Sequence, residues 1–268
     1  MSRRGWALFL AMSVIWGIPY LLIKVAVGEV SPVVVVAARC VVGAAILLPW
    51  TIAKGQLRPA LRHWRALLLF TVLEMTAPWL LLSYAETKLS SSLTGLLVAT
   101  VPFVAALLGL DVGGAQLLPI AAVALTVVGY ATGPMVVSRA LPEVPGVAAS
   151  AIALSVTAVV YAPFAAPQLG DAVHASAKAL LSVAGLGIVC TALALAVFFL
   201  LIREVGPQRS LVITFVNPAV AVVLGVLLLD EPFTLGIALG LPLVLAGCVL
   251  ATRRSTPVPE AETVVTPG

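Results

Sequence analysis

Two charged residues, Arg39 and Glu74, lie within long apolar runs of this 268-residue chain. A charged side chain in an apolar interior is costly, so it generally has a partner or a use. A buried carboxyl group can take up and release a proton, and a guanidinium group can bind an anion. The alternatives are a structural Glu74 that is protonated or paired with an arginine, and an Arg39 that extends to the aqueous boundary. Glu74 is therefore the leading candidate for proton exchange, and Arg39 for pairing with Glu74 or for anion binding.

Further polar and aromatic residues in these runs are candidates for ligand contact. Trp16, Trp79 and Tyr84 have rings that can stack on an aromatic or cationic ligand. Trp and Tyr also collect at membrane–water boundaries without binding anything. Asn217 offers an amide to a ligand or to a free backbone carbonyl. Lys24 lies close to the end of its apolar run, where extension of the side chain into the headgroup region is favoured.

The composition indicates that the solvent of this chain is lipid. Hydrophobic residues make up 62% of the sequence and charged residues 10%, and the mean hydropathy is +1.17. A soluble domain has roughly 45–50% apolar and about 25% charged residues. The net charge of +4 is accordingly not interpreted as a nucleic-acid-binding surface. Since backbone groups in lipid must be bonded internally, and no alternation typical of a barrel is present, an all-α polytopic membrane bundle is predicted.

Nine apolar runs are long enough to cross a bilayer, for which about 20 residues are needed. Pro, Gly and charged residues separate them. The predicted spans are Trp6–Val27, Pro32–Ala53, Ala66–Tyr84, Leu93–Leu110, Leu117–Val137, Val147–Ala166, Ala179–Ile202, Leu211–Leu229 and Phe233–Ala251.

The helical rise places the two buried charges at different depths. At about 1.5 Å per residue, Glu74 lies roughly 12 Å and Arg39 roughly 21 Å from the cytoplasmic edge of their spans. Two long side chains can close the difference if the helices adjoin, so a buried pair is one prediction. Glu86 and Lys88 follow at a helix end and are predicted to be solvated.

Residues for enzymatic chemistry or metal binding are sparse. The two histidines, His63 and His174, fall in predicted loops, and no H-E-x-x-H, G-x-S-x-G or phosphate-loop motif occurs. The three cysteines, Cys40, Cys190 and Cys248, lie in apolar runs without a C-x-x-C pair. We therefore predict no metal site, no disulfide and no cofactor, and a non-enzymatic function, with an intramembrane enzyme as the less favoured alternative.

The two halves of the chain are weakly similar when Pro102 is aligned with Pro218. The polar turn 87–92 then faces 203–208, although chance similarity between two apolar segments is the alternative. Interrupted helices at matching positions of two repeats are typical of transporter binding sites, and simple packing kinks are equally consistent with prolines. Pro78, beside Trp79, is a third predicted helix break.

The first half is one helix shorter than the second half in this alignment. Charge supports a deletion near Leu108–Asp111, since cytoplasmic loops are rich in Lys and Arg. With one added span, only Lys88 and Lys178 face outward; with nine spans, the bias disappears. The inward-facing residues would be Arg3, Arg4, Lys54, Arg58, Arg62, Arg65, Arg139, Arg203, Arg209, Arg253 and Arg254.

The chain resembles the EamA-domain carriers of the drug/metabolite transporter superfamily. Trp16-Gly17, Lys24, Pro32 and Arg39 have the spacing of that family's opening helices. The closing pattern of the family is similar to Asn217-Pro218, Gly225, Glu231, Gly240 and Gly247. The resemblance implies a ten-helix fold of two inverted five-helix repeats, with both termini in the cytoplasm and a central cavity between the repeats. The fifth helix of that fold is missing from this sequence.

The resemblance also implies a function and a domain organisation. Residues 6–110 would form a truncated first repeat, 116–252 the second repeat, and 253–268 a disordered cytoplasmic tail. The implied function is secondary-active export or exchange of small metabolites, amino acids or drugs across the plasma membrane, with proton coupling; an inactive truncated carrier is the alternative. The expected partners are the lipid bilayer and a small-molecule substrate, together with a homodimer mate at the Gly236–Gly240 motif.

Overall fold

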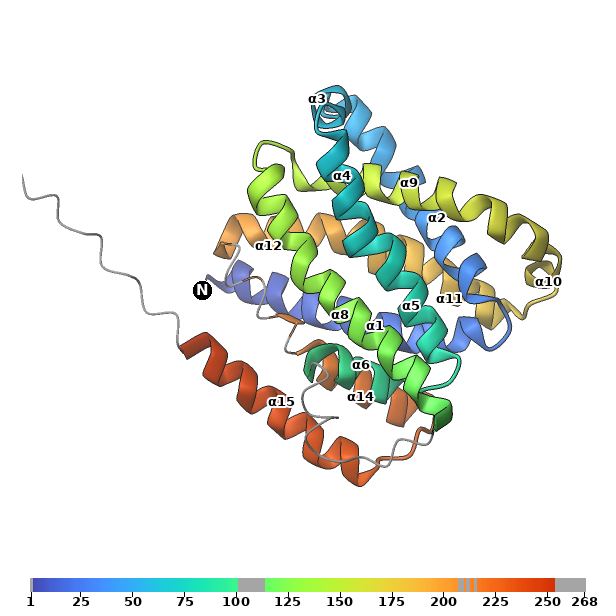
Figure 1. Cartoon of the computed structure of the whole chain (residues 1–268). Helices are drawn as coiled ribbons and strands as arrows, with labels where there is room; N and C mark the ends of the chain where they lie inside the picture. The colour runs from blue at the N-terminus through green and yellow to red at the C-terminus, as the bar shows by residue number, and fades with distance from the viewer. Residues whose placement is uncertain (1, 101–113, 207–209, 211–212, 215, 254–268) are drawn as a thin grey trace, which may run out of the picture.

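The chain folds into a bundle of helices (Figure 1). The computed structural model describes residues 2–100, 114–206, 210, 213–214 and 216–253, and the described part contains no strand. The all-α prediction is therefore confirmed. The first half contains α1 (Arg3–Val27), α2 (Pro32–Ala53), α3 (Leu57–Leu61), α4 (Trp64–Thr71), η1 (Val72–Thr76), α5 (Ala77–Glu86) and α6 (Ser91–Thr100). The second half contains α8 (Gly114–Ala140), α9 (Gly146–Ala165), η2 (Ala166–Gln168), α10 (Leu169–Val173), α11 (Ala177–Gly187), η3 (Ile188–Leu193), α12 (Ala194–Val205), α14 (Asn217–Leu228) and α15 (Leu235–Arg253).

Six of the described helices are long and apolar enough to cross a membrane. They correspond to six of the predicted spans, with bounds of Arg3–Val27, Pro32–Ala53, Trp64–Glu86, Leu117–Ala140, Gly146–Gln168 and Ala177–Val205. Three of the helix starts follow a serine, at Ser2, Ser31 and Ser176, whose hydroxyl accepts a backbone N–H of the first turn. The predicted span at Leu211–Leu229 is a shorter helix, α14, which begins only at Asn217-Pro218. The predicted span at Phe233–Ala251 corresponds to α15, which is shifted by two residues to Leu235–Arg253. Proline has no N–H to donate and is therefore tolerated in a first helical turn.

The two halves repeat each other with an offset of 116 positions and inverted packing. In this offset α1 matches α8, α2 matches α9, and α4–α5 matches α11–α12. The packing follows the same correspondence, since α1 packs on α11 and α12 while α8 packs on α4 and α5. The matched helices α2 and α9 pack against each other across the repeat boundary, and α6 packs against α14. Such reciprocity is the geometry of inverted repeats.

The predicted deletion concerns residues outside the described part. Residues 101–113, which include Pro102 and the junction 108–111, are not described, and neither is the tail 254–268. Within the described part, α15 has no counterpart in the first half. The single helix α8 runs from Gly114 to Ala140 and so places Gly114 and Arg139 at opposite ends of the bundle.

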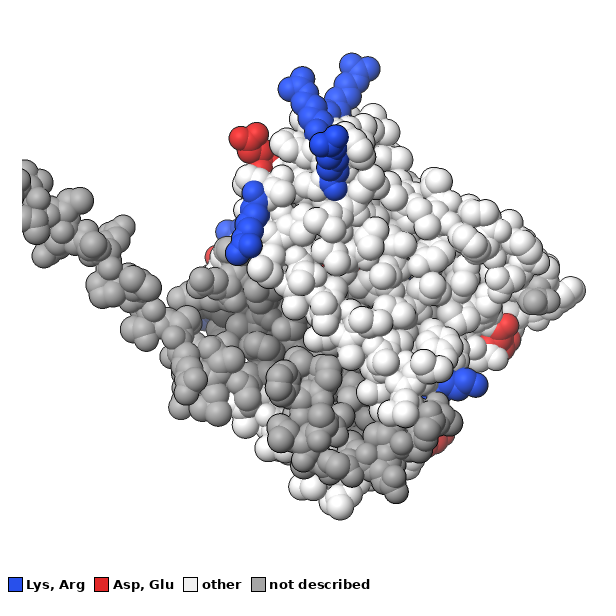
Figure 2. Space-filling view, in the orientation of Figure 1, with Lys and Arg blue, Asp and Glu red and all other residues white. Residues whose placement is uncertain are grey.

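Positive side chains gather at one end of the bundle, around α3 (Figure 2). Lys54, Arg58, Arg62 and Arg65 flank or belong to this short helix and are all exposed. The broad surface between the two ends carries almost no charge in this view. We refer below to the α3 end and, for the opposite end where α1 turns into α2, to the Glu29 end. The pattern is typical of a membrane protein whose α3 end faces the cytoplasm.

Two turns of π-helix interrupt the long helices at matching positions of the repeats. They are η1 (Val72–Thr76) and η3 (Ile188–Leu193), and their first residues differ by the repeat offset of 116. Pro78 follows η1 closely and lacks the N–H that an α-helix would direct to the carbonyl of Glu74. Its counterpart, Ala194, is not a proline, so the π turn does not depend on proline alone. The π turn η1 thus lies directly before Pro78, where a helix break was predicted, and π turns are frequent at functional sites.

A glycine on α8 lets that helix press against the first π turn. A Cβ at Gly129 would collide with the carbonyl oxygen of Leu73 and come within 2.8 Å of Cγ of Pro78. Because a backbone atom cannot yield as a side chain can, Gly129→Ala is expected to destabilise the protein by about 1–3 kcal/mol. Thermal unfolding in detergent would measure the loss. Gly236→Ala is the matched control, since its Cβ would meet only Oγ1 of Thr234 at 3.8 Å; equal midpoints for the two variants would contradict the prediction.

Candidate functional site

Arg39 is the centre of a polar cluster in the middle of the bundle. Its side chain is only 7% exposed, and its guanidinium carbon lies 3.7 Å from the centre of the Trp79 ring. Nε donates a hydrogen bond of 2.8 Å to Oγ1 of Thr191. Thr191 belongs to the π turn η3 and donates in turn to the carbonyl of Leu186. Arg39 therefore does not extend to the aqueous boundary; it is held by one residue of each repeat besides its own helix.

Two tyrosines complete this cluster. Tyr20 of α1 and Tyr130 of α8 both lie within electrostatic reach of Arg39. The Tyr130 hydroxyl also faces the side chain of Trp79 and the carboxyl of Glu74. The Arg39 cluster, defined as Arg39, Trp79, Thr191, Tyr20 and Tyr130, thus combines a cation, three aromatic rings and hydroxyl groups. Such a set can bind a small ligand that carries an anionic group beside an apolar or aromatic part.

Glu74 lies in the π turn η1, on the α8 side of the cluster. Its Oε2 atom is buried and has no hydrogen-bond partner among the described residues. The carboxyl group packs against α8 at Gly133, where an added Cβ would collide with Oε2. An ionised carboxylate oxygen that is buried without a donor is costly, and water or a cation that reaches it would remove this cost. This arrangement suits a group that exchanges a proton.

The predicted ion pair between Arg39 and Glu74 is wrong for this conformation. Arg39 uses Nε on Thr191 and its π face on Trp79, whereas Glu74 faces Gly133 and Tyr130. Tyr130 is near both residues and connects them electrostatically. The depth estimate could not show this, because it gives positions along the helix axis and not the direction in which each side chain points.

Three further candidates lie away from the Arg39 cluster. Trp16 stacks at 4.7 Å on Phe198 in a separate apolar cluster between α1 and α12. Tyr84 is 38% exposed on the outer surface of α5. With its amide oriented to suit its neighbours, Asn217 donates to the carbonyls of Ile213 at 2.9 Å and Ser13 at 3.0 Å. The amide of Asn217 thus joins the start of α14 to a backbone carbonyl of α1.

Lys24 and Glu86 belong to a second polar cluster, at the Glu29 end. Nζ of Lys24 donates to the carbonyls of Glu86 at 2.7 Å and Leu89 at 2.6 Å. It therefore fastens α1 to the end of α5, and the predicted extension into the headgroup region is wrong. The prediction that Glu86 is solvated is also wrong, because Glu86 is 0% exposed, whereas Lys88 is exposed as predicted.

Glu231, in the turn between α14 and α15, holds the start of α6 in the other repeat. Oε1 accepts the backbone N–H of Ser91 at 2.7 Å, and Oε2 accepts the N–H and hydroxyl of Ser92 at 2.9 and 2.5 Å. Partial burial acts to raise the pKa of Glu231, but these hydrogen bonds outweigh it and lower the pKa below its ordinary value. A carboxylate at a helix N-terminus is also favoured by the helix dipole. Gly225 leaves room for this contact, since a Cβ there would collide with Glu231 and Ser92.

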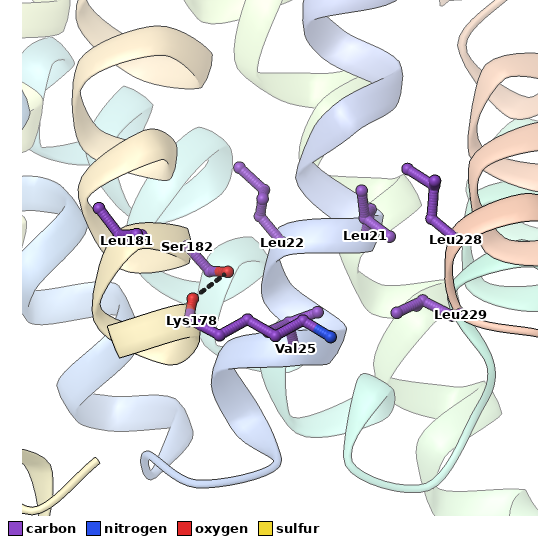
Figure 3. A pocket seen from close by; sticks show the side chains of 8 residues that line it. All are labelled: Leu21, Leu22, Val25, Lys178, Leu181, Ser182, Leu228 and Leu229. Carbon is purple, nitrogen blue, oxygen red and sulfur yellow. Dashed lines mark hydrogen bonds between the residues drawn. The ribbon is translucent and has the colours of Figure 1, made fainter. Parts of the chain in front are cut away.

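The Arg39 cluster is closed in this conformation. Trp79 and Tyr20 are each 8% exposed and Thr191 is 1% exposed. A hollow of about 320 Å³ lies elsewhere, between α1, α11 and α14 near the Glu29 end. Figure 3 shows that leucines of α1, α11 and α14 surround it and that Lys178 reaches across one side. The hollow is apolar and peripheral, so it is not the central cavity expected between the repeats.

Sequence reasoning missed Tyr20, Tyr130 and Thr191. Each of them is a polar residue within an apolar span. The same criterion selected Trp16, Trp79 and Tyr84 as candidates, but it was not extended to these three. The repeat alignment also pointed to Thr191, because the residue before it occupies the position of Glu74 in the second repeat. That residue is Cys190, which is buried and carries a free thiol, as does Cys40.

The fold and the central cluster define a polytopic helical membrane protein built from two inverted repeats. The EamA-like transporter family matches residues 3–122 and 117–253, and the chain belongs to this family. It is a membrane transporter of the drug/metabolite type. No curated protein matches the chain. A solved structure titled "Crystal structure of protein" has a similar fold, with a TM-score of 0.63 over 92% of this chain and 96% of that chain at 17% identity.

Proposed function

We propose that this protein is a secondary-active carrier that moves small metabolites with an anionic group, such as the carboxylate of amino acids or of other organic acids, across the plasma membrane by alternating access. The guanidinium of Arg39 binds the anionic group, and the ring of Trp79 with the two tyrosines contacts the remainder. Glu74 exchanges a proton with the aqueous phase and couples substrate movement to the proton gradient. The α3 end faces the cytoplasm.

One observation carries this proposal: the two π turns occur at matching repeat positions and both border the Arg39 cluster. Thr191 of η3 bonds Arg39, and Glu74 of η1 faces Tyr130 of the same cluster. Interrupted helices at matching positions of inverted repeats are the usual place for substrate and coupling ions. A π turn also leaves backbone groups free to rearrange when a helix moves.

The burial of the cluster supports an alternating-access mechanism. Arg39 and Trp79 are nearly inaccessible, so substrate reaches them only when one end of the bundle opens. The helices that would separate are those that pack across the repeat boundary, including α1 on α14 and α5 on α8. Rigid-body movement of repeats around a fixed site is the general form of such transport.

The test is a transport panel with the purified full-length chain in proteoliposomes. Radiolabelled amino acids, small carboxylates and phosphorylated metabolites are compared with uncharged amide or ester analogues, with and without an imposed pH gradient. We expect uptake of at least one anionic class, strengthened by the gradient and abolished by a protonophore. Transport restricted to cations or uncharged compounds, or no transport of any kind, would overturn the proposal.

A further inference from the structure

The second polar cluster, at the Glu29 end, contains a carboxyl group without a partner. Glu86 is 0% exposed, and neither of its carboxyl oxygens has a hydrogen-bond partner among the described residues. Burying an ionised carboxylate in this way is unfavourable, and binding of a proton removes the charge. The surroundings of the Glu86 carboxyl group therefore favour a bound proton.

Segments of both repeats meet at this carboxyl group. Lys24 of α1 fastens its ammonium to the carbonyls of Glu86 and Leu89, at the junction of α5 and α6. Glu231, from the turn between α14 and α15, holds the N-terminus of α6. Opening this end between the repeats must disturb these contacts, because α1, α6 and α14 all pack against one another there.

The charged and titratable groups that face Glu86 are Lys24 and Tyr20 on α1 and Glu231 in the turn. The hydrogen bonds from Ser91 and Ser92 keep Glu231 ionised. Lys24 donates to two backbone carbonyls rather than to the carboxyl oxygens, although its charge lies within electrostatic reach of Glu86. Tyr20 also lies within reach of Arg39, and thereby connects this cluster to the proposed substrate site.

We propose that Glu86 is a second proton-binding site, separate from Glu74, which controls the opening of the Glu29 end. In the closed form the carboxyl is protonated and Lys24 binds the two carbonyls. On opening, the proton leaves to water at that end, and the ammonium of Lys24 moves from the carbonyls to the new carboxylate. This exchange removes the donor from the carbonyl of Leu89 and so frees the start of α6 from α1, while Lys24 stays paired with Glu86 at the end of α5. The proposal rests on alternating access in the proposed function, but not on the role of Glu74.

The experiment measures opening directly and needs no substrate. A cysteine replaces Leu89, which is 2% exposed, in a chain whose Cys40, Cys190 and Cys248 are replaced by alanine. The rate of labelling by a membrane-impermeant maleimide is followed against pH in proteoliposomes. The same background with Lys88→Cys, at an exposed neighbouring position, corrects for the pH dependence of the thiol itself.

The corrected labelling rate is expected to rise about tenfold per pH unit over the window in which one proton is released on opening. Glu86→Gln should give a low rate without pH dependence, because an amide cannot release a proton. Glu74→Gln should keep the full pH dependence, which separates this proposal from the coupling role of Glu74. A corrected rate that is constant between about pH 5 and pH 9, or one that rises equally in Glu86→Gln, would overturn the proposal.

A second measurement covers the case in which Glu86→Gln fails to fold. Infrared spectra of the otherwise unchanged Glu74→Gln protein should contain a protonated-carboxyl band at neutral pH that disappears as the pH rises. Absence of that band at neutral pH would show that Glu86 is already ionised and would refute the proposal.

Discussion

Replacing Arg39 by glutamine is expected to weaken binding of an anionic substrate by about 30- to 5,000-fold. Loss of one partner of a buried charge pair costs about 2–5 kcal/mol, which corresponds to that range. Arg39 is the cation of the central cluster, and its guanidinium meets the Trp79 ring at 3.7 Å. The measurement is the concentration dependence of transport, with the variant at equal abundance in the membrane.

Two further variants separate the charge of Arg39 from its planar shape. Arg39→Lys keeps the charge but loses the stacking surface and the fork of donors, so it should recover only part of the affinity. Trp79→Leu should lower the affinity for the substrate by about 2- to 30-fold, since a cation–π contact contributes about 0.5–2 kcal/mol. Arg58→Gln, at an exposed position of α3, is the control and should have no effect. Unchanged affinity in Arg39→Gln would exclude the anion-binding role.

Glu74→Gln is expected to abolish accumulation driven by a pH gradient. If one proton moves with each substrate, the intact protein concentrates substrate about tenfold per unit of pH difference, and the amide variant not at all. The amide has nearly the shape of the protonated acid, so packing against Gly133 should be kept. Accumulation at several imposed gradients provides the measurement.

Exchange of labelled for unlabelled substrate distinguishes lost coupling from lost folding. Exchange needs binding and reorientation but no net proton movement, so it should continue in Glu74→Gln. Glu143→Gln removes an exposed carboxylate between α8 and α9 and should behave as the unchanged protein. Gradient-driven accumulation that survives in Glu74→Gln would assign coupling to another group.

The long helices were predictable from sequence because lipid imposes a simple rule. A span must be apolar for about 20 residues, and the charges that separate spans mark its ends. The bounds of Pro32–Ala53 agree with the structure residue for residue. Arg39 and Glu74 were predictable as buried residues for the same reason.

The partners of these residues were not predictable, since they depend on how helices distant in sequence rotate against each other. Thr191 meets Arg39 only because α2 packs on the η3 turn of the second repeat. Lys24 turns to the carbonyls of Glu86 and Leu89 because α5 ends beside it, where unpaired carbonyls need donors. A hydropathy pattern contains no information about either rotation.

The π turn in each repeat also allows the helix that follows it to rotate about its own axis. A π turn accommodates one residue more than the α-helical turn around it, and one residue of an α-helix corresponds to about 100° of rotation. If η1 tightened into an ordinary turn, the helix beyond it would swivel by that angle, and the Trp79 ring would leave the face of Arg39. The corresponding change in η3 would withdraw the hydroxyl of Thr191 from the same guanidinium. In the carrier mechanism proposed above, release of a bound anion would need only a change of one residue in the winding of either half, without bending of the long helices.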